Sequence, residues 1–402
     1  MRQRPGLIGD YRSDAVIFGS GVQKTWIGLL MAATLFMAFG GSLGPIALSS
    51  DMLQLAVVAV FASIGAIGLN IVSGMAGQIS LGHAFFLGLG AFTAAVLGGV
   101  EGTAPALDPV TGELTQVVVL AGYQLDMIIW LPAAGLVAAL AGLLVAPLAT
   151  RLRGMYLAFV TLGLVFLGDH IFREAEFFTG GAFVGRTTAE LSLGGFRFDQ
   201  HGDVFGVYLE KNQKLLLLGL VLLVVLGLAA KNLFRSKVGR AMAAIRDRDI
   251  AAEIMGINLA RYKLIAFVIS SFYAGIAGAL LWSVVGRLQP EQFGFMLSIE
   301  YIAMILIGGV ATVSGAIMGA FFLTFLPKVV EWMAGFSLDL GFMTLSLPFL
   351  SDEVASGMLT VSQFQQILFG AMIIGFLIFE PLGLYGIWIR IRNYWKAWPF
   401  SY

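Results

Sequence analysis

Long apolar runs separated by shorter polar segments make up most of this chain. A helix needs about 20 apolar residues to cross roughly 30 Å of hydrocarbon, so runs of this length predict membrane-spanning helices. Nine runs approach or exceed that length, and we place them at residues 26–48, 52–72, 79–100, 127–148, 155–172, 214–230, 262–285, 299–333 and 364–386.

The run at 299–333 is too long for one crossing, because a helix rises about 1.5 Å per residue. Its centre, GGVATVSGAIMG at residues 308–319, is rich in glycine, which weakens helices. We therefore divide the run into 299–311 and 315–333, which raises the number of spans to ten. Since 299–311 is short, we expect a broken or re-entrant element near residues 308–319.

The distribution of charge supports ten spans. Cytoplasmic loops of membrane proteins carry an excess of Lys and Arg. Basic residues gather in the N-terminal segment, at 149–154, in 231–263 and near the C-terminus, whereas the loops 101–126 and 334–363 hold acidic residues and no Lys or Arg. Ten spans that start inside place every basic segment in the cytoplasm, whereas nine would place the C-terminus outside.

We thus predict an all-α, polytopic protein of the cell membrane with both termini in the cytoplasm. Residues 1–25 form a cytoplasmic segment, 26–386 the membrane domain and 387–402 a cytoplasmic tail. The first run is too long for a signal-peptide core and lacks a cleavage pattern, so we expect it to be retained as a span.

The amino-acid composition excludes several classes of protein and of functional site. Of the 402 residues 58% are hydrophobic and 12% charged, against about a quarter charged in soluble domains. The absence of cysteine excludes disulfides and cysteine-ligated metals, and three scattered histidines form no metal-site pattern. No phosphate-binding glycine–lysine motif is present, so we expect no catalytic residues, no cofactor bound by the chain itself and no nucleic-acid partner.

Two glycine-rich motifs carry the polar side chains expected at membrane depth. The first is SGMAGQISLGHAFFLGLGAF at residues 73–92, and the second is the break at 308–319, which weakly resembles it. Polar groups at this depth usually face the bundle interior or a wet cavity. The candidates for a substrate pathway are Asn70, Gln78, Ser80, His83, Thr312 and Ser314.

The alternative for each of these side chains is that it ties neighbouring helices together or caps a break. We expect Gly74 to Gly77 to form a tight turn at the cytoplasmic side, after which the chain re-enters as a closely packed span. Small residues would allow that close packing in lipid.

The segment 231–263 is larger than a connector requires. RAMAAIR predicts a short basic helix, and Asp249 is placed to cap a second helix, IAAEIM, which ends at Gly256. Two such helices would lie across the cytoplasmic face with Ala, Ile and Met available to a groove. This favours a protein partner over a basic loop that only touches anionic lipid.

Three stretches together carry a family resemblance. GLNIVSGMAGQISLGHAFFLGLGAF, VGRAMAAIRDRDIAAEIMGINLARYKLIAF and IEYIAMILIGGVATVSGAIMGAFF occur in this order within residues 68–326. They resemble the permease subunits of branched-chain amino acid ABC importers, and among these the LivM type. The N-terminal 25 residues, the loops 101–126 and 173–213, and the segment 334–362 fall outside the resemblance.

The resemblance implies a chain that works with a second, LivH-type permease, two ATPase subunits that use ATP, and an extracytoplasmic substrate-binding protein, all at a lipid membrane. It also implies that 231–263 is the cytoplasmic coupling loop that docks on an ATPase. The residues assigned to coupling are Arg240, Arg246, Asp249, Glu253 and Gly256. The same family includes relatives for urea and amides.

Other functions stay open at this point. A stand-alone, ion-coupled secondary transporter also uses broken helices at mid-membrane. Against it, Glu300, Glu331 and Glu380 are all expected near the ends of spans, and the 231–263 element would have no role. A membrane scaffold without a substrate is the third possibility.

Overall fold

The structure is a computed structural model. It describes residue 28 and residues 49–107, 114–152, 154–204, 207–334, 337–339, 344–346, 350–351 and 359–397. The segment 1–25, expected in the cytoplasm, lies outside the described residues, and so does the span expected at 26–48, apart from Gly28. The division into 1–25, 26–386 and 387–402 stays a prediction.

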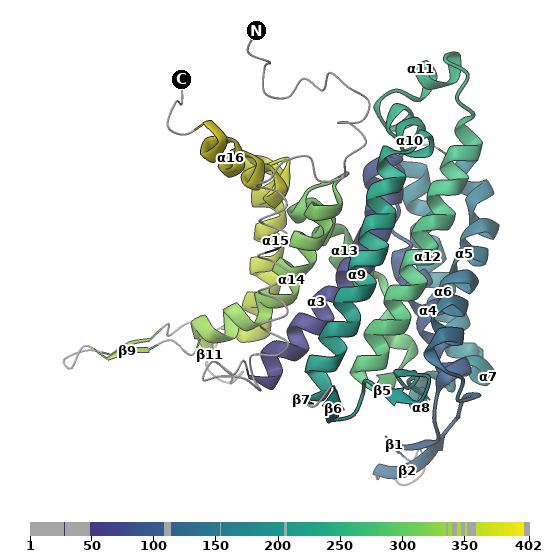
Figure 1. Cartoon of the computed structure of the whole chain (residues 1–402), viewed down its shortest axis with the longest axis vertical. Coiled ribbons are helices and arrows are strands. Elements are labelled where there is room, and N and C mark those ends of the chain that lie inside the picture. The colour runs from purple at the N-terminus through teal and green to yellow at the C-terminus, as the bar shows by residue number, and fades with distance from the viewer. Residues whose placement is uncertain are drawn as a thin grey trace.

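The chain forms a bundle of long helices that run side by side between two ends (Figure 1). The long helices and their bounds are α3 (Ser50–Leu69), α4 (His83–Gly98), α5 (Met127–Arg151), α6 (Met155–Glu174), α9 (Lys211–Arg235), α12 (Leu259–Val285), α13 (Phe295–Gly308), α14 (Val313–Ala334) and α15 (Val361–Phe379). Every span expected from 52–72 onward overlaps one of these helices.

The predicted fold, a bundle of apolar helices, is therefore present. Among the described residues, the number of helices that could cross a membrane is smaller than the ten spans expected. Within the described ranges, six helices are long and apolar enough to cross a membrane, or seven if a bent pair counts as one span. Helices α4 and α13 are apolar but shorter. The total of ten spans stays a prediction.

The bent pair corrects the span expected at 364–386. Helix α15 ends at Phe379, and α16 (Gly383–Ala397) leaves it at 50°. The bend follows from the sequence Glu-Pro-Leu-Gly at 380–383, in which Gly383 adopts a φ of +63° that favours glycine. Hydropathy alone had continued the span through this bend.

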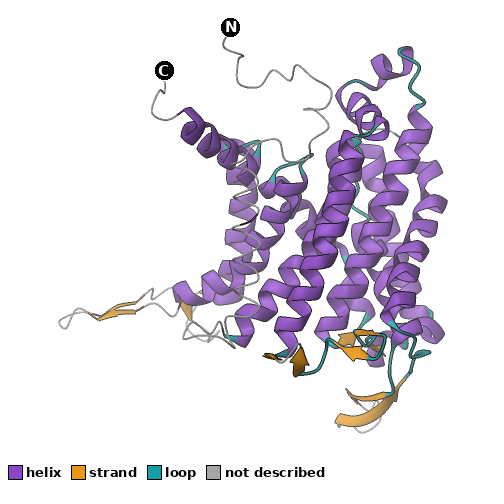
Figure 2. Ribbon diagram, in the orientation of Figure 1, coloured by secondary structure: helices purple, strands orange, loops and turns teal. Residues whose placement is uncertain are grey.

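One end of the bundle carries short strands, and we call it the strand end (Figure 2). Its antiparallel pairs are β1 (Gly102–Leu107) with β2 (Leu114–Val119), β3 (Arg186–Thr187) with β8 (Arg287–Leu288), β4 (Ser192–Leu193) with β5 (Phe196–Arg197), and β6 (Gly202–Val204) with β7 (Val207–Leu209). The short helices α7 (Glu176–Thr179), α8 (Gly181–Val184) and the 3₁₀ turn η2 (Pro290–Phe293) lie among them.

Four further short strands lie between α14 and α15. They are β9 (Ser337–Asp339) paired with β10 (Thr344–Ser346), and β11 (Leu350–Ser351) paired with β12 (Leu359–Thr360). Each described sheet has only two strands. The loops between the long helices thus contain local strand pairs that hydropathy did not predict.

The opposite end carries α10 (Lys237–Asp247) and α11 (Asp249–Ile254), and we call it the basic end (Figure 1). Two helices expected within 231–263 are therefore found. The expected cap is corrected: Arg248 occupies the N-cap position of α11, and Asp249 is its first residue. Gly256 ends the second helix as predicted, with a φ of +82°.

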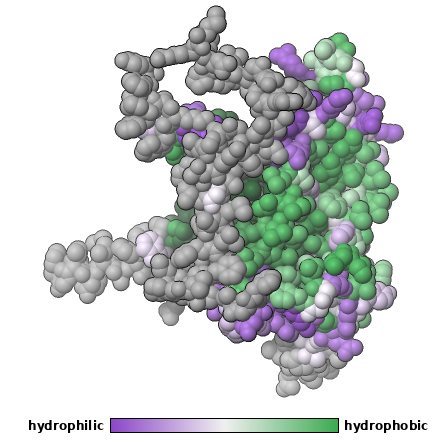
Figure 3. All heavy atoms as spheres, in the orientation of Figure 1, coloured by the Kyte–Doolittle hydropathy of each residue, from purple (hydrophilic) through white to green (hydrophobic). Residues whose placement is uncertain are grey.

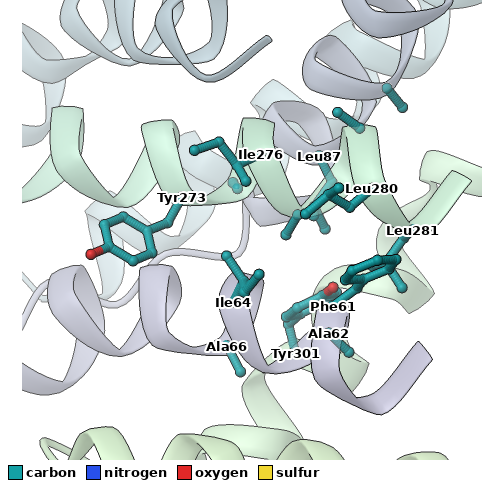
Figure 4. Packing of buried hydrophobic residues seen from close by; sticks show 14 of the residues in the cluster. Phe61, Ala62, Ile64, Ala66, Leu87, Tyr273, Ile276, Leu280, Leu281 and Tyr301 are labelled. Atoms are coloured by element: carbon teal, nitrogen blue, oxygen red, sulfur yellow. The ribbon is translucent and has the colours of Figure 1, made fainter. Parts of the chain in front are cut away.

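Helices α3 and α12 form the centre of the bundle. α12 packs against α3, α4 and α5, while α3 packs against α9, α12 and α14. Figure 4 shows their contact, where Phe61 and Ile64 of α3 meet side chains of α12 such as Leu280. The peripheral α5 and α6 expose many apolar side chains, as expected of surfaces that face lipid. A hydrophobic band lies between two polar ends (Figure 3).

Glycines let the backbones of α4, α5 and α12 touch. A Cβ atom on Gly278 would lie 2.0 Å from the Leu87 carbonyl oxygen, and one on Gly90 would lie 2.1 Å from that of Gly275. Gly275 in turn meets the Ala134 backbone of α5. This is the packing by small residues that the glycine content predicted.

Replacing Gly278 by Ala is expected to destabilise the protein by about 1–3 kcal/mol, because backbone must move to admit the methyl group. The matched control is Gly163→Ala in α6, where an added Cβ meets nothing within 4 Å. Thermal unfolding in detergent measures both. A Gly278→Ala protein that melts with the control would contradict the packing argument.

Candidate functional site

Helix α3 does not end in an ordinary turn. It continues into the π-helical segment η1 (Asn70–Met75), after which the chain is irregular until α4 begins at His83. The Gln78 N–H donates to the Val72 carbonyl oxygen at 3.0 Å, and Gly77 has a φ of +65°. Short π-helical segments occur frequently at functional sites.

This corrects the tight turn expected from Gly74 to Gly77. Gly74 is still within η1, the chain reverses after Met75, and α4 starts four residues later than the span expected from residue 79. Hydropathy could not show this, because an irregular stretch such as ISLG can be as apolar as a helix.

The first N–H groups of a helix lack partners within that helix. At the start of α4 another helix supplies one: the Ala84 N–H donates to Ser298 Oγ at 3.0 Å. Just before the helix, the Leu81 N–H donates to Thr161 Oγ1 at 2.9 Å. Thr161 lies on α6 and Ser298 on α13. Sequence reasoning missed both residues, because single hydroxyls inside apolar runs carry no local signal.

Asn70 joins the two glycine-rich motifs. Its Oδ1 accepts the Ala311 N–H at 2.8 Å, and its Nδ2 donates to the Thr312 carbonyl oxygen at 2.7 Å. The buried amide therefore satisfies both a donor and an acceptor of the backbone between α13 and α14. We call this pair of hydrogen bonds the Asn70 clamp. Sequence separations of 241 and 242 residues hid it from any local pattern.

The break expected at 308–319 is found at residues 309–312, between α13 and α14. Thr312 caps α14, since its Oγ1 accepts the Gly315 N–H at 3.1 Å and donates to the Gly309 carbonyl oxygen at 3.0 Å. Ala311 has a φ of +63°, which is uncommon for a residue with a side chain. The Asn70 clamp thus holds a break with an unusual backbone conformation.

Glycine is required where the two motifs meet. A Cβ atom on Gly74 would lie 2.0 Å from Asn70 Oδ1 and 2.6 Å from the Ala311 nitrogen. One on Gly383, at the bend before α16, would lie 2.5 Å from the Ile307 carbonyl oxygen. The π-helix, the break and the bend between α15 and α16 therefore form one packed junction.

The remaining pathway candidates occupy different surroundings. Gln78, Ser80 and His83 are all buried, at 2–3% exposure, whereas Ser314 is exposed on the first turn of α14. Neither amide atom of Gln78 has a hydrogen-bond partner among the described residues. The His83 ring lies 4.9 Å from the ring of Tyr301, a further buried residue that sequence reasoning missed.

The expected coupling residues divide into two groups. Arg246 faces the bundle, with Nη1 3.0 Å from the Gly74 carbonyl oxygen, and it pairs with Asp247 at 3.1 Å. Arg240 donates instead to the Arg235 carbonyl oxygen at 2.8 Å. Glu253 and Gly256 are exposed around the tip formed by α11, and the Asp249 carboxylate accepts the Ile250 N–H at 2.9 Å.

A polar cleft of about 220 Å³ lies at the basic end, between the first glycine motif and α10. Gly77 and Gln78 of the first motif line it, together with Arg246 of α10, Asp249 of α11 and Lys263 of α12. The cleft places the end of the first glycine motif beside the charged helix pair, so the two sites proposed from sequence are neighbours.

The position of Glu300 in its helix differs from the one expected. The sequence placed it at the outer end of a span, but α13 begins at Phe295, so Glu300 lies in the second turn. It is two residues beyond Ser298, which binds the start of α4, and it is exposed on an apolar helix. A carboxylate at this level favours a surface that faces water or a partner over one that faces lipid.

Replacing Asn70 by Ala is expected to cost about 2 kcal/mol, because two hydrogen bonds of roughly 1 kcal/mol each are lost. Asn70→Asp retains the acceptor for Ala311 but sets a carboxylate against the Thr312 carbonyl, so it is expected to destabilise as well. The control is Asn212→Ala, which removes an exposed amide that binds Ser50. Melting temperatures in detergent that match for Asn70→Ala and the control would refute the clamp.

Comparison with known proteins identifies the family. A family described as branched-chain amino acid transport system, permease component, matches residues 51–377. The high-affinity branched-chain amino acid transport system permease protein LivM of Salmonella typhimurium is 33% identical over 288 residues, which are 69% of this chain and 63% of that protein. LivM of Escherichia coli is 32% identical over 291 residues, with the same shares.

A shorter sequence match is to the permease of a sugar transport system. The xylose transport system permease protein XylH of Escherichia coli is 36% identical over 124 residues, 29% of this chain and 30% of that protein. No solved structure matches the chain. The chain spans less than two thirds of the length of the LivM proteins. By the extent of the family match, this chain belongs to the permease components of branched-chain amino acid transport systems.

Proposed function

We propose that the chain is a membrane-spanning permease subunit of an ATP-driven ABC importer for branched-chain, aliphatic amino acids. It forms the translocation pathway with a second, LivH-type permease. Two ATPase subunits bind and hydrolyse ATP, and an extracytoplasmic binding protein delivers the substrate. Membership in the permease family supports this role.

In this proposal the basic end faces the cytoplasm. The segment 231–263 holds eight Lys and Arg residues, and it forms α10, α11 and the start of α12 at that end. The basic α16 lies toward the same end (Figure 1). Cytoplasmic segments carry such an excess of positive charge. Both termini are then cytoplasmic, and the strand end meets the binding protein.

The observation that carries the proposal is the surface of α11. Ile250 is 63% exposed, and Ile254 and Met255 are each 81% exposed, at the tip of the helix pair. Ala252, on the inner side, is buried. Large apolar side chains that protrude from a charged helix pair mark a protein-binding surface. We assign this tip, together with Glu253, to the groove of an ATPase subunit.

The pathway residues are proposed from their surroundings. Asn70 and Thr312 already hold each other, which favours a role in shaping the junction. Gln78 has no partner for its amide among the described residues and lines the cleft at the basic end, so we assign it to the inner exit. Ser80 and His83 follow Gln78 along the chain and are buried, and Ser314 lies exposed beside the break.

An ion-coupled secondary transporter is the second candidate, and one observation favours it. Glu300 is a carboxylate two residues beyond Ser298, which binds the start of α4, and such transporters bind ions and substrate at interrupted helices. The exposed apolar tip of α11 would then have no function. Urea and amides, which the family resemblance also allows, are the alternative substrate class for the same importer architecture.

Reconstitution distinguishes these functions. In proteoliposomes, the chain with its second permease, ATPases and binding protein is expected to accumulate leucine only with ATP. The isolated chain is expected to accumulate none under a proton or sodium gradient. Accumulation by the isolated chain would establish the secondary transporter instead. Competition by leucine against urea at the binding protein then identifies the substrate class.

Replacing Ile254 by Asp is expected to weaken binding of the ATPases at least tenfold, because burying an isoleucine contributes roughly 1.5–3 kcal/mol and the new charge would be desolvated. Arg261→Gln, an exposed change at the start of α12, is the matched control. Co-purification and binding titrations with the ATPase measure the effect. Equal affinity for the two variants would exclude α11 as the docking surface.

A further inference from the structure

Arg246 projects from α10 toward the membrane bundle. Its guanidinium donates to the Gly74 carbonyl oxygen, with Nη1 3.0 Å from the oxygen. Its side chain also lies close against Gly77, where an added Cβ would be 2.9 Å from Arg246 Cγ. This direction contrasts with Ile254 and Met255, which point away from the bundle at the tip of α11.

The hydrogen bond to Gly74 is a helix cap supplied from another element. The last carbonyl groups of a helix lack partners within it, and a basic side chain there also interacts favourably with the helix dipole. Gly74 lies in η1, which continues α3 directly. The position of Arg246 is therefore tied to the end of the most buried helix of the bundle.

The same π-helical segment holds the Asn70 clamp at its first residue. Gly74 packs so closely on Asn70 and Ala311 that no side-chain atom fits between them. Arg246, Gly74, Asn70 and Ala311 thus form an unbroken series of contacts from α10 to the break at 309–312. At the break, Ala311 has a φ of +63°, a conformation that residues with a side chain rarely adopt.

We propose that Arg246 is a positioning residue that transmits displacement of α10 through Gly74 and the Asn70 clamp to the break at 309–312. This inference rests on the proposed function, in which ATPases move α10 and α11. It gives the helix pair two surfaces with separate roles. The tip around Ile254 binds the ATPase, and the inner surface around Arg246 acts on the pathway.

Transport assays test this in the complete reconstituted complex. Arg246→Ala is expected to retain its ATPases and to hydrolyse ATP, but to transport at least tenfold less leucine per ATP. Arg246→Lys restores part of the ratio, because an ammonium group can still donate to the Gly74 carbonyl. Lys237→Ala, exposed at the start of α10, is the control and keeps the wild-type ratio.

If Arg246 and Asn70 act through the same series of contacts, a second prediction follows for their double variant. Asn70→Ala is expected to lower the transport ratio as Arg246→Ala does, and the double variant is expected to be no worse than the more severe single variant. Effects that multiply would show independent roles and overturn the proposal. Loss of the ATPases from the Arg246→Ala complex would show a docking residue and would overturn it as well.

A labelling experiment separates this inference from the proposed function. The chain has no cysteine, so Val310→Cys, which is 39% exposed within the break, is a clean reporter. In the isolated chain, Arg246→Ala is expected to change the rate of maleimide labelling at this cysteine severalfold, and Lys237→Ala is not. An unchanged rate with normal ATP-driven uptake overturns the link alone. A changed rate without ATP-driven uptake supports the link and overturns the importer.

Discussion

The Asn70 clamp is the interaction on which the arrangement of this protein depends. One buried amide satisfies a donor and an acceptor of backbone that lies outside any helix. In a membrane-embedded bundle such backbone groups need internal partners, because lipid offers none. The clamp therefore permits α13 and α14 to be separate helices with a break between them, and it fixes that break against the end of α3.

Close glycine contacts make the clamp possible. Gly74 allows Asn70 to approach Ala311, and Gly383 brings the bend before α16 against the end of α13. At the bundle centre, Gly278 and Gly90 bring the backbones of α4 and α12 together. Small residues thus substitute for the hydrophobic driving force that is absent between helices in lipid. The result is a junction in which several interrupted helices meet in close contact.

This junction connects the helix pair α10 and α11, proposed to bind the ATPases, with the break at 309–312, proposed to border the pathway. The segment that forms α10 and α11 lies at the basic end, and Arg246 links it to the π-helical end of α3. Gln78 and Arg246 line the same cleft. In the proposed importer, a conformational change driven by ATP in partner subunits would therefore reach the break by contacts that are already formed.

Much of this fold could be predicted from the sequence, because hydropathy period and length determine which segments suit a bilayer. Runs such as 127–148 and 262–285 coincide with α5 and α12, and glycine content marked the break that lies at 309–312. The tertiary structure alone decided that Asn70 binds residues 241 and 242 positions away, that Ser298 caps α4 and that Arg246 turns inward. These contacts depend on how helices dock, and a polar residue within an apolar run carries no record of its distant partner.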